Sequence, residues 1–174
     1  PVKHGIITLA YVVEVDGEEY ESGELRANPG HLGKEIDPRA LEVNGITREE
    51  IATYPTPHGM KRELEMIMGR YVDKYRRDDK LVAGGYNVGF DVGFLRQLWT
   101  DCGDPYFGSW FAFGVIDPSQ IIRFLQYTGE LPEFTEGKLG QVAERFGISA
   151  VGAHDALADI RITIEIVKKI RRTA

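Results

Sequence analysis

The chain has 174 residues, of which 43% are hydrophobic, and its formal net charge is −6. This length allows one domain with a substantial core, and no repeat or linker interrupts it, so we expect a single domain over residues 1–174. The acidic balance excludes a protein that holds nucleic acid mainly by neutralising phosphates. One cysteine, Cys102, excludes a disulfide framework and a Cys-rich zinc site and suits the cytoplasm. No apolar run is long enough for a membrane span, so we expect no membrane contact.

The first part of the chain predicts an antiparallel hairpin. Residues 4–30 alternate in polarity and are rich in β-branched side chains, with Asp16-Gly17 as a turn signal. This pattern is typical of two strands that each have one buried face.

Helices are predicted next. Residues 37–55 predict a short helix that ends at Asn44-Gly45 and a second one that begins at Thr47, where Glu50 completes a capping-box pattern. Residues 56–80 predict one longer helix. Its basic cluster could bind phosphate, but a solvated helix face explains the cluster equally well. The cluster consists of Lys74, Arg76, Arg77 and Lys80.

The second half of the chain alternates between buried strands and helices. The predicted strands are 81–87 and 110–117, and the predicted helices are 91–103, 118–129, 137–148 and 150–170. A hairpin followed by alternating strands and helices indicates the α/β class, with a mixed central sheet flanked by helices.

Two carboxylates lie on the apolar stripes of predicted helices, where an uncompensated charge is costly. These are Asp91, in line with Phe94, Leu95, Leu98 and Cys102, and Asp159, in line with Ala156, Ile160, Thr163, Val167 and Ile170. A helix cap or a satisfied polar contact would explain one such acid. For two, a shared divalent cation is more economical, because Mg²⁺ binds one or two carboxylates together with substrate phosphate oxygens.

A histidine precedes the second of these acids. His154 lies in a glycine-containing loop just before the last helix, and an imidazole that titrates near neutrality can activate a water molecule. The alternative is an ordinary surface or core histidine, which is how we interpret His4, His31 and His58.

At these positions the sequence resembles the DEDDh 3′→5′ exonucleases, the DnaQ-like group that includes replicative proofreading subunits and ribonuclease T. The resemblance rests on four stretches in the order of the family: ALEVNGIT (40–47), NVGFD followed by FL (87–95), VID before PSQIIRFL (115–125) and AHDALAD (153–159). It covers essentially the whole chain.

This resemblance implies an RNase H-like fold and two divalent cations, Mg²⁺ or Mn²⁺. It also implies stepwise release of nucleoside monophosphates from the 3′ end of single-stranded DNA or RNA. Carried over by position, Asp91 and Asp159 become metal ligands and His154 the general base.

The resemblance also implies four substrate contacts. Phe90 would lie against the terminal nucleotide, where stacking tolerates every base. Val43 and Asn44 would line the cleft that holds the last base, and Asn87 would shape the turn into the helix. For Phe90 and Val43 the alternative is ordinary core packing.

One family motif is not found. The first motif, an Asp-x-Glu at the end of the first strand, supplies the other two carboxylates, whereas the early Asp-x-Glu of this chain, Asp16-Gly17-Glu18, lies in the predicted hairpin turn. We therefore expect that residues 1–174 lack the first strand and the first motif, and that this stretch alone is inactive.

Three functions remain open at this stage. The first is a metal-dependent exonuclease, free-standing or associated with a DNA polymerase. The second is a catalytically inactive nucleic-acid-binding or polymerase-associated domain of the same fold. The third is an unrelated α/β phosphohydrolase, against which the chain has no Walker-type glycine-rich loop.

Overall fold

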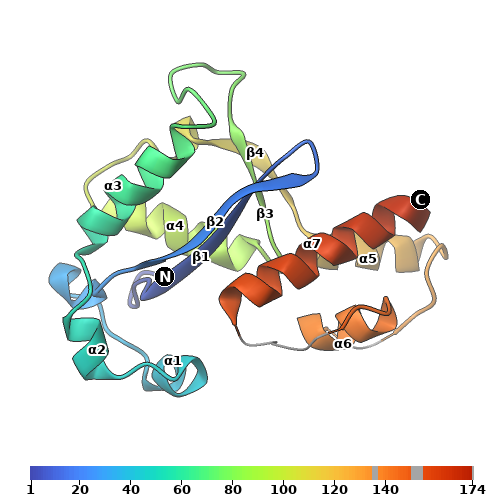
Figure 1. Cartoon of the computed structure of the whole chain (residues 1–174), viewed down its shortest axis with the longest axis horizontal. Helices are drawn as coiled ribbons and strands as arrows, with labels where there is room; N and C mark the ends of the chain where they lie inside the picture. The colour runs from blue at the N-terminus through green and yellow to red at the C-terminus, as the bar shows by residue number, and fades with distance from the viewer. Residues whose placement is uncertain (135–136, 150–154, 174) are drawn as a thin grey trace. The chain divides into compact units, whose positions relative to one another are not determined.

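The structure, a computed structural model, describes residues 1–134, 137–149 and 155–173, with the side chains of the last segment up to residue 172. Its elements follow the order predicted from the sequence (Figure 1). They are β1 (Thr8–Val15), β2 (Glu18–Arg26), η1 (Pro29–Leu32), α1 (Pro38–Asn44), α2 (Arg48–Ala52), α3 (Pro57–Met68), β3 (Leu81–Gly84), α4 (Gly89–Asp101), η2 (Phe107–Ser109), β4 (Phe111–Ile116), α5 (Pro118–Tyr127), α6 (Leu139–Arg145) and α7 (Ala156–Thr173).

The predicted hairpin is confirmed. β1 and β2 pair with each other, and the turn between them is the pair Asp16 and Gly17, with φ of 54° and 87°. Two successive residues with positive φ are typical of the tight turn whose twist matches that of the flanking strands. Asp16 therefore serves the turn and does not end a strand.

β3, α4 and β4 form a strand–helix–strand unit. The backbone N–H of Leu81 donates to the carbonyl of Trp110 and that of Gly85 to the carbonyl of Ile116, both at 3.0 Å. Because the pairing advances in the same direction on both strands, they are parallel, as expected when a helix connects them. In the described residues the strands form two two-stranded sheets, β1 with β2 and β3 with β4.

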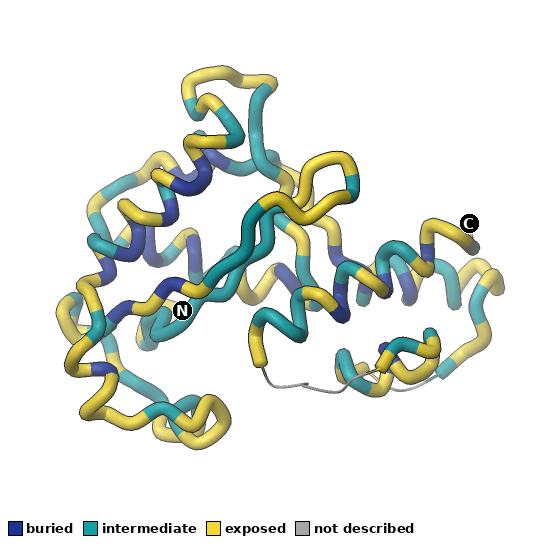
Figure 2. Tube along the Cα trace, in the orientation of Figure 1, coloured by how far each residue is buried: buried dark blue, intermediate teal, exposed yellow. Residues whose placement is uncertain are grey.

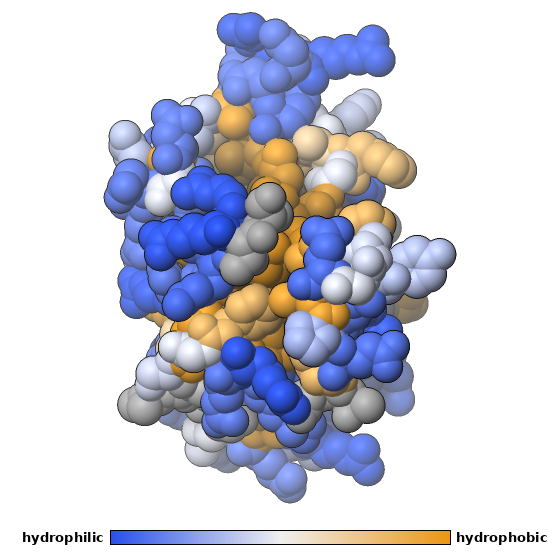
Figure 3. All heavy atoms as spheres, turned by 90° about the vertical axis from the view of Figure 1, so that its right-hand side faces the viewer, coloured by the Kyte–Doolittle hydropathy of each residue, from blue (hydrophilic) through white to orange (hydrophobic). Residues whose placement is uncertain are grey.

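Strand β4 keeps large apolar side chains in solvent. Phe113 is fully exposed, and Val115 and Ile116 are each 45% exposed. Apolar atoms also reach the surface between hydrophilic side chains on the face drawn in Figure 3. Neither face of this strand is fully covered in the described part of the chain.

The chain divides into two compact units, which we describe separately. The first comprises residues 1–9, 24–83 and 89–115, and its core lies where α3 packs on α4 (Figure 2). The buried hydrophobic side chains of these two helices include Met60, Leu64, Ile67, Met68, Leu95, Leu98 and Trp99. Trp99 is completely buried, and Phe107 meets it edge-to-face at 5.5 Å between ring centroids.

A buried ammonium group lies inside this core. Lys61 Nζ contacts Glu65 Oε1 at 2.9 Å and Asp104 Oδ2 at 2.7 Å, and it lies 5.0 Å from the centroid of the Trp99 ring. Burial by itself would lower the pKa of Lys61, but the hydrogen bonds to Asp104 and Glu65 outweigh it and raise that pKa. The hydrogen bond from Lys61 also lowers the pKa of the Asp104 carboxyl. The two carboxylates thus balance the charge of the buried, protonated ammonium group.

The prediction of one helix over residues 56–80 is wrong at its C-terminal end. α3 begins as expected, with Thr56 as its cap, but ends at Met68, and residues 69–80 form a loop. In this loop Lys80 Nζ donates to the carbonyls of Lys74 and Ser109, at 2.8 and 2.6 Å. These tertiary bonds outweigh the helix propensity of the basic segment, which carries few apolar residues to bury.

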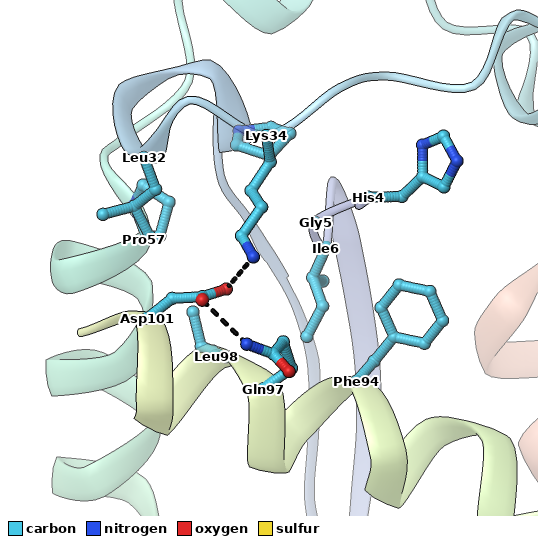
Figure 4. Close-up of a pocket in the computed structure, with 11 residues that line it drawn as sticks. His4, Gly5, Ile6, Leu32, Lys34, Pro57, Phe94, Gln97, Leu98 and Asp101 are labelled. Carbon is cyan, nitrogen blue, oxygen red and sulfur yellow. Dashed lines mark hydrogen bonds and ion pairs between the residues drawn. The ribbon is translucent and has the colours of Figure 1, made fainter. Parts of the chain in front are cut away.

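Within the first unit, Lys34 links the N-terminal segment to the end of α4. Lys34 Nζ lies 2.8 Å from Asp101 Oδ2 and donates to the carbonyl of Val2 at 2.7 Å. Asp101 also accepts a hydrogen bond from Gln97 at 2.8 Å, as drawn in Figure 4. The small pocket around these groups has a volume of about 10 Å³, which is room for about one water molecule.

The second unit comprises residues 10–23, 84–88 and 116–174, and three helices form its core. α7 packs on α5 and on α6. Their buried side chains are Ile122, Val142, Ala143, Ile162, Ile166 and Ile170. The predicted stripe of α7 is confirmed at Thr163 and Ile170, which are buried, and wrong at Ala156, which is exposed. Ile162 and Ile166, which were not predicted, are also buried. No helix in the described ranges is both long and apolar enough to cross a bilayer.

The Lys61 cluster generates a prediction about stability and pH. We expect Asp104→Asn to lower the free energy of unfolding at pH 7 by about 1–2 kcal/mol, in the range for hydrogen bonds to charged groups. Because the pKa of Asp104 is lowered in the folded state, its contribution is complete above the ordinary carboxyl pKa and is lost as pH falls through the lower folded value. Urea titrations from pH 7 to pH 3 should show the two proteins converging.

The control is Glu35→Gln, which removes an ion pair with Lys3 whose two side chains are 62% and 66% exposed. An exposed pair contributes little, so this variant should unfold like the parent at every pH. A constant difference between Asp104→Asn and the parent from pH 7 to pH 3 would contradict the proposed role of the Asp104 charge.

Candidate active site

Asp91 lies in the first turn of α4, within the first unit. Its predicted position on the buried stripe is wrong, because the residue is exposed, whereas Leu95, Leu98 and Trp99 are buried. The physical reason is that the first turn of α4 extends beyond the part of the helix that is packed. An exposed acid at a helix N-terminus is favoured by the helix dipole and needs no metal to be stable there.

Phe90 immediately precedes this acid and is 64% exposed. Its ring lies 4.9 Å from that of Phe94, at an interplanar angle of 51°. The alternative of ordinary core packing is therefore excluded for Phe90. An exposed ring supported by a second ring is a surface on which a planar group can stack.

Asn87 occupies the turn before α4 and adopts φ of 58°. Asparagine tolerates this left-handed conformation better than most residues, which accounts for its place in the turn. Its backbone N–H donates to Asp117 Oδ1 at 3.1 Å, within the second unit. The side chain of Asn87 is exposed.

Asp117 is the residue of this region that sequence reasoning missed. Its carboxylate is buried and accepts three hydrogen bonds, from the backbone N–H of Asn87 and from the N–H and hydroxyl of Ser119, at 3.1, 2.9 and 2.6 Å. It is also the N-cap of α5. The Asp-Pro-Ser sequence signals that cap, but only the fold shows that the same oxygen holds the Asn87 turn.

Asp159 lies in the first turn of α7, within the second unit. It is half-buried and lies one turn before Ile162 and Thr163, so it stands at the N-terminal end of the buried stripe, close to the prediction. Thr163 donates a hydrogen bond to its carbonyl at 2.8 Å. Asp155 immediately precedes the helix, and its Oδ1 accepts from the N–H groups of Leu157 and Ala158 at 2.9 and 3.0 Å.

Val43 and Asn44 form the end of α1, in the first unit. Val43 is 72% exposed, which excludes core packing for it as well. The Asn44 side chain donates to the carbonyl of Ala40 at 2.7 Å, and Gly45, with φ of 64°, ends the helix as predicted. The next helix has the predicted capping box, in which Thr47 and Glu50 each bond the backbone of the other.

Both predicted metal ligands lie in the described part of the chain, whereas the predicted general base does not. Asp91 belongs to the first unit and Asp159 to the second, and His154 lies outside the described residues. Both acids offer the hard oxygen donors that Mg²⁺ and Mn²⁺ prefer. No group of three or more potential ligands occurs within residues 1–134, 137–149 and 155–172. The carboxylate oxygens of Asp91 and Asp159 are suitable ligands for a divalent cation. A site for two metal ions would need more ligands than these two carboxylates provide.

The sequence as a whole matches a known family. A profile of the RNase T family of exonucleases matches residues 1–167. The chain belongs to this exonuclease family. The match extends over the segments that carry Val43, Asn87, Asp91 and Asp159, so the resemblance drawn from the motifs is confirmed.

Two curated relatives of this exonuclease domain illustrate its context. A PolC-type DNA polymerase III of Clostridium perfringens is 27% identical over 94% of the chain, which spans 10% of the polymerase. An exodeoxyribonuclease I of Buchnera aphidicola is 27% identical over 78% of the chain, which spans 29% of that enzyme. The exonuclease domain thus spans only a minor part of these relatives.

The fold has a solved counterpart in exonuclease I. That structure superposes with a TM-score of 0.74 at 20% identity and covers 95% of this chain and 37% of the other. The predicted RNase H-like α/β fold is confirmed by this likeness.

The Asp117 hydrogen bonds generate a second prediction. We expect Asp117→Ala to lower the free energy of unfolding by about 1–3 kcal/mol, because a helix cap is lost and the part-buried backbone N–H of Asn87 loses its acceptor. Asp117→Asn, which keeps one carbonyl oxygen as an acceptor, should lower the free energy of unfolding clearly less. Chemical denaturation monitored by circular dichroism measures both values.

The matched control is Asp37→Ala, which removes the cap of the short helix α1 but no buried tertiary acceptor. If Asp37→Ala and Asp117→Ala lower the free energy of unfolding equally, the hydrogen bond from Asn87 to Asp117 contributes nothing beyond helix capping.

Proposed function

We propose that this exonuclease domain hydrolyses phosphodiester bonds at the 3′ end of single-stranded DNA or RNA and releases nucleoside monophosphates. The observation that carries the proposal is the family match over residues 1–167, in which the two acids singled out from the sequence each occupy the first turn of a helix. At that position a carboxylate is held in one place by the helix and still reaches solvent.

Each proposed site residue has one task. Asp91 and Asp159 would hold divalent cations, Mg²⁺ or Mn²⁺, together with phosphate oxygens of the substrate. Bound cations supply charge stabilisation for the attacking and leaving oxygens of the displacement. His154 would accept a proton from the attacking water at an imidazole nitrogen.

The residues proposed to contact the substrate are exposed to solvent. Phe90 presents an exposed ring that can stack on the terminal base, and Val43 and Asn44 present exposed side chains at the end of α1. Asn87 would act through the backbone, since its left-handed conformation fixes the turn that leads to Phe90 and Asp91.

We also propose that residues 1–174 act as one exonuclease domain that lacks the first strand and the acidic pair of the first motif. Two observations support this. Asp16 lies in a tight turn, and β4 carries uncovered apolar side chains and pairs with one strand, β3, among the described residues. A two-stranded sheet is marginally stable on its own and gains from a further strand.

The second candidate function is a catalytically inactive, polymerase-associated domain of the same fold. The position of Asp16 in a turn favours it, because the acids of the first motif would then be missing from the site. The PolC-type relative, of which this chain spans 10%, fits an association with a DNA polymerase.

The test is shortening of 5′-labelled single-stranded DNA and RNA oligonucleotides with Mg²⁺ or Mn²⁺. It compares residues 1–174 with a form extended upstream by its encoded residues. We expect a ladder of shortened products from the extended form, reduced about 10²–10⁴-fold by His154→Ala, the usual contribution of a general base. Binding of oligonucleotide by both forms without any shortening would instead establish the inactive domain.

Metal binding is tested separately by electron paramagnetic resonance of Mn²⁺ titrated into the same proteins. We expect Asp91→Asn and Asp159→Asn each to weaken Mn²⁺ binding at least about tenfold, because each removes a charged oxygen ligand. Glu63→Gln, an exposed acid on α3, is the control and should bind Mn²⁺ like the parent. Equal Mn²⁺ affinity in all four proteins would exclude both aspartates as ligands.

A further inference from the structure

The loop between α3 and β3, residues 69–80, projects beyond the helix and the strand that it joins (Figure 1). It borders an open hollow within the first unit. The hollow has a volume of about 460 Å³, within the range of roughly 300–1,000 Å³ that is usual for ligand pockets. Its lining consists of residues 69–75, Asp79 and Trp110. None of the proposed metal ligands or substrate contacts belongs to it.

One cation lies between two aromatic rings at this hollow. Lys74 Nζ lies 5.2 Å from the ring centroid of Trp110 and 5.4 Å from that of Tyr75. Trp110 is buried, and its indole N–H donates to Glu65 at 3.3 Å, whereas the side chain of Tyr75 is 86% exposed. One ring is therefore anchored in the core and the other is offered to solvent.

The loop is held in shape by its own carboxylates. Asp79 accepts from the backbone N–H of Asp73 at 2.9 Å, and Asp73 accepts from that of Tyr75 at 3.0 Å. Lys80 binds two carbonyls, as described above. The backbone at Tyr75 is thus fixed before any ligand arrives, which lowers the entropic cost of binding.

The charges of the loop are unbalanced in favour of cations. Residues 70–80 contain five basic and three acidic side chains in a chain of net charge −6. The acids Asp73 and Asp79 are engaged with the backbone, and Asp78 pairs with Arg76 at 3.0 Å. Arg77 is exposed and follows Tyr75 by two residues in the same loop, which is largely exposed in Figure 2.

We propose that this hollow and the loop beside it form a second binding site for single-stranded nucleic acid, in which a base stacks on Tyr75 and a neighbouring phosphate contacts Arg77. An exposed aromatic ring flanked by cations matches both parts of a nucleotide, its planar base and its anionic phosphate. An acidic peptide would use the cations but gain little from the ring. The proposal rests on the proposed function, because that function supplies the single-stranded ligand.

The test is binding of fluorescein-labelled oligothymidylate of 20 nucleotides to the full 174-residue chain, measured by fluorescence anisotropy in EDTA so that hydrolysis is not required. We expect Tyr75→Ala to weaken binding between about fivefold and a hundredfold, the contribution of one stacked base, and Tyr75→Phe to restore it. Arg77→Ala should reduce the slope of log affinity against log salt by about 0.7, the effect of one phosphate contact.

The matched controls are Tyr127→Ala, an 89% exposed tyrosine at the end of α5, and Arg48→Ala, an exposed arginine at the start of α2. Both should bind like the parent. Parental affinity in Tyr75→Ala, or an equal loss in Tyr127→Ala, would overturn the proposal. So would polyglutamate of matched charge displacing the oligonucleotide as well as unlabelled oligothymidylate does, because the loop would then recognise charge alone.

The binding test and the nuclease assay can fail independently. Mg²⁺-dependent shortening by a form whose binding is unaffected by Tyr75→Ala overturns the loop site and leaves the proposed function standing. Loss of binding in Tyr75→Ala without shortening by either form supports the loop site and rejects hydrolysis.

Discussion

The ammonium group of Lys61 is the constraint on which the first unit depends. It is buried, so it must stay close to Glu65 and Asp104, and it lies over the ring of Trp99. Glu65 in turn accepts the indole N–H of Trp110. One charge therefore fixes α3 against the segment that follows α4 and, through Glu65, against Trp110, the residue just before β4. The helix that presents Phe90 and Asp91 and the loop that presents Tyr75 both extend from this cluster.

The sequence correctly predicted the turns and helix ends that depend on interactions between neighbouring residues. The Asp16-Gly17 turn, the Thr47–Glu50 capping box and the end of α1 at Gly45 each need only a few neighbouring residues, and each is present. The end of α3 was not predicted, because residues 69–80 are held by Ser109 and by contacts around Trp110, which are far away in the sequence. Periodicity cannot detect such partners.

The candidate site likewise combines features that local sequence patterns predict with features that depend on the tertiary structure. Sequence reasoning found Asp91 and Asp159 from their positions on helix faces, but it could not tell that the first turn of α4 is solvent-exposed. It missed Asp117, because the bond from Asn87 joins residues thirty positions apart. It treated Phe90 and Val43 as equally consistent with core packing, and the exposure of both side chains decides this point.

The placement of the two tryptophans has a spectroscopic consequence. The chain contains only Trp99 and Trp110, and both belong to the first unit. Selective excitation of tryptophan therefore observes the unfolding of that unit alone, whereas the helical ellipticity also includes α5, α6 and α7. The two signals together reveal whether the units unfold in one cooperative transition or in two, without the introduction of any label.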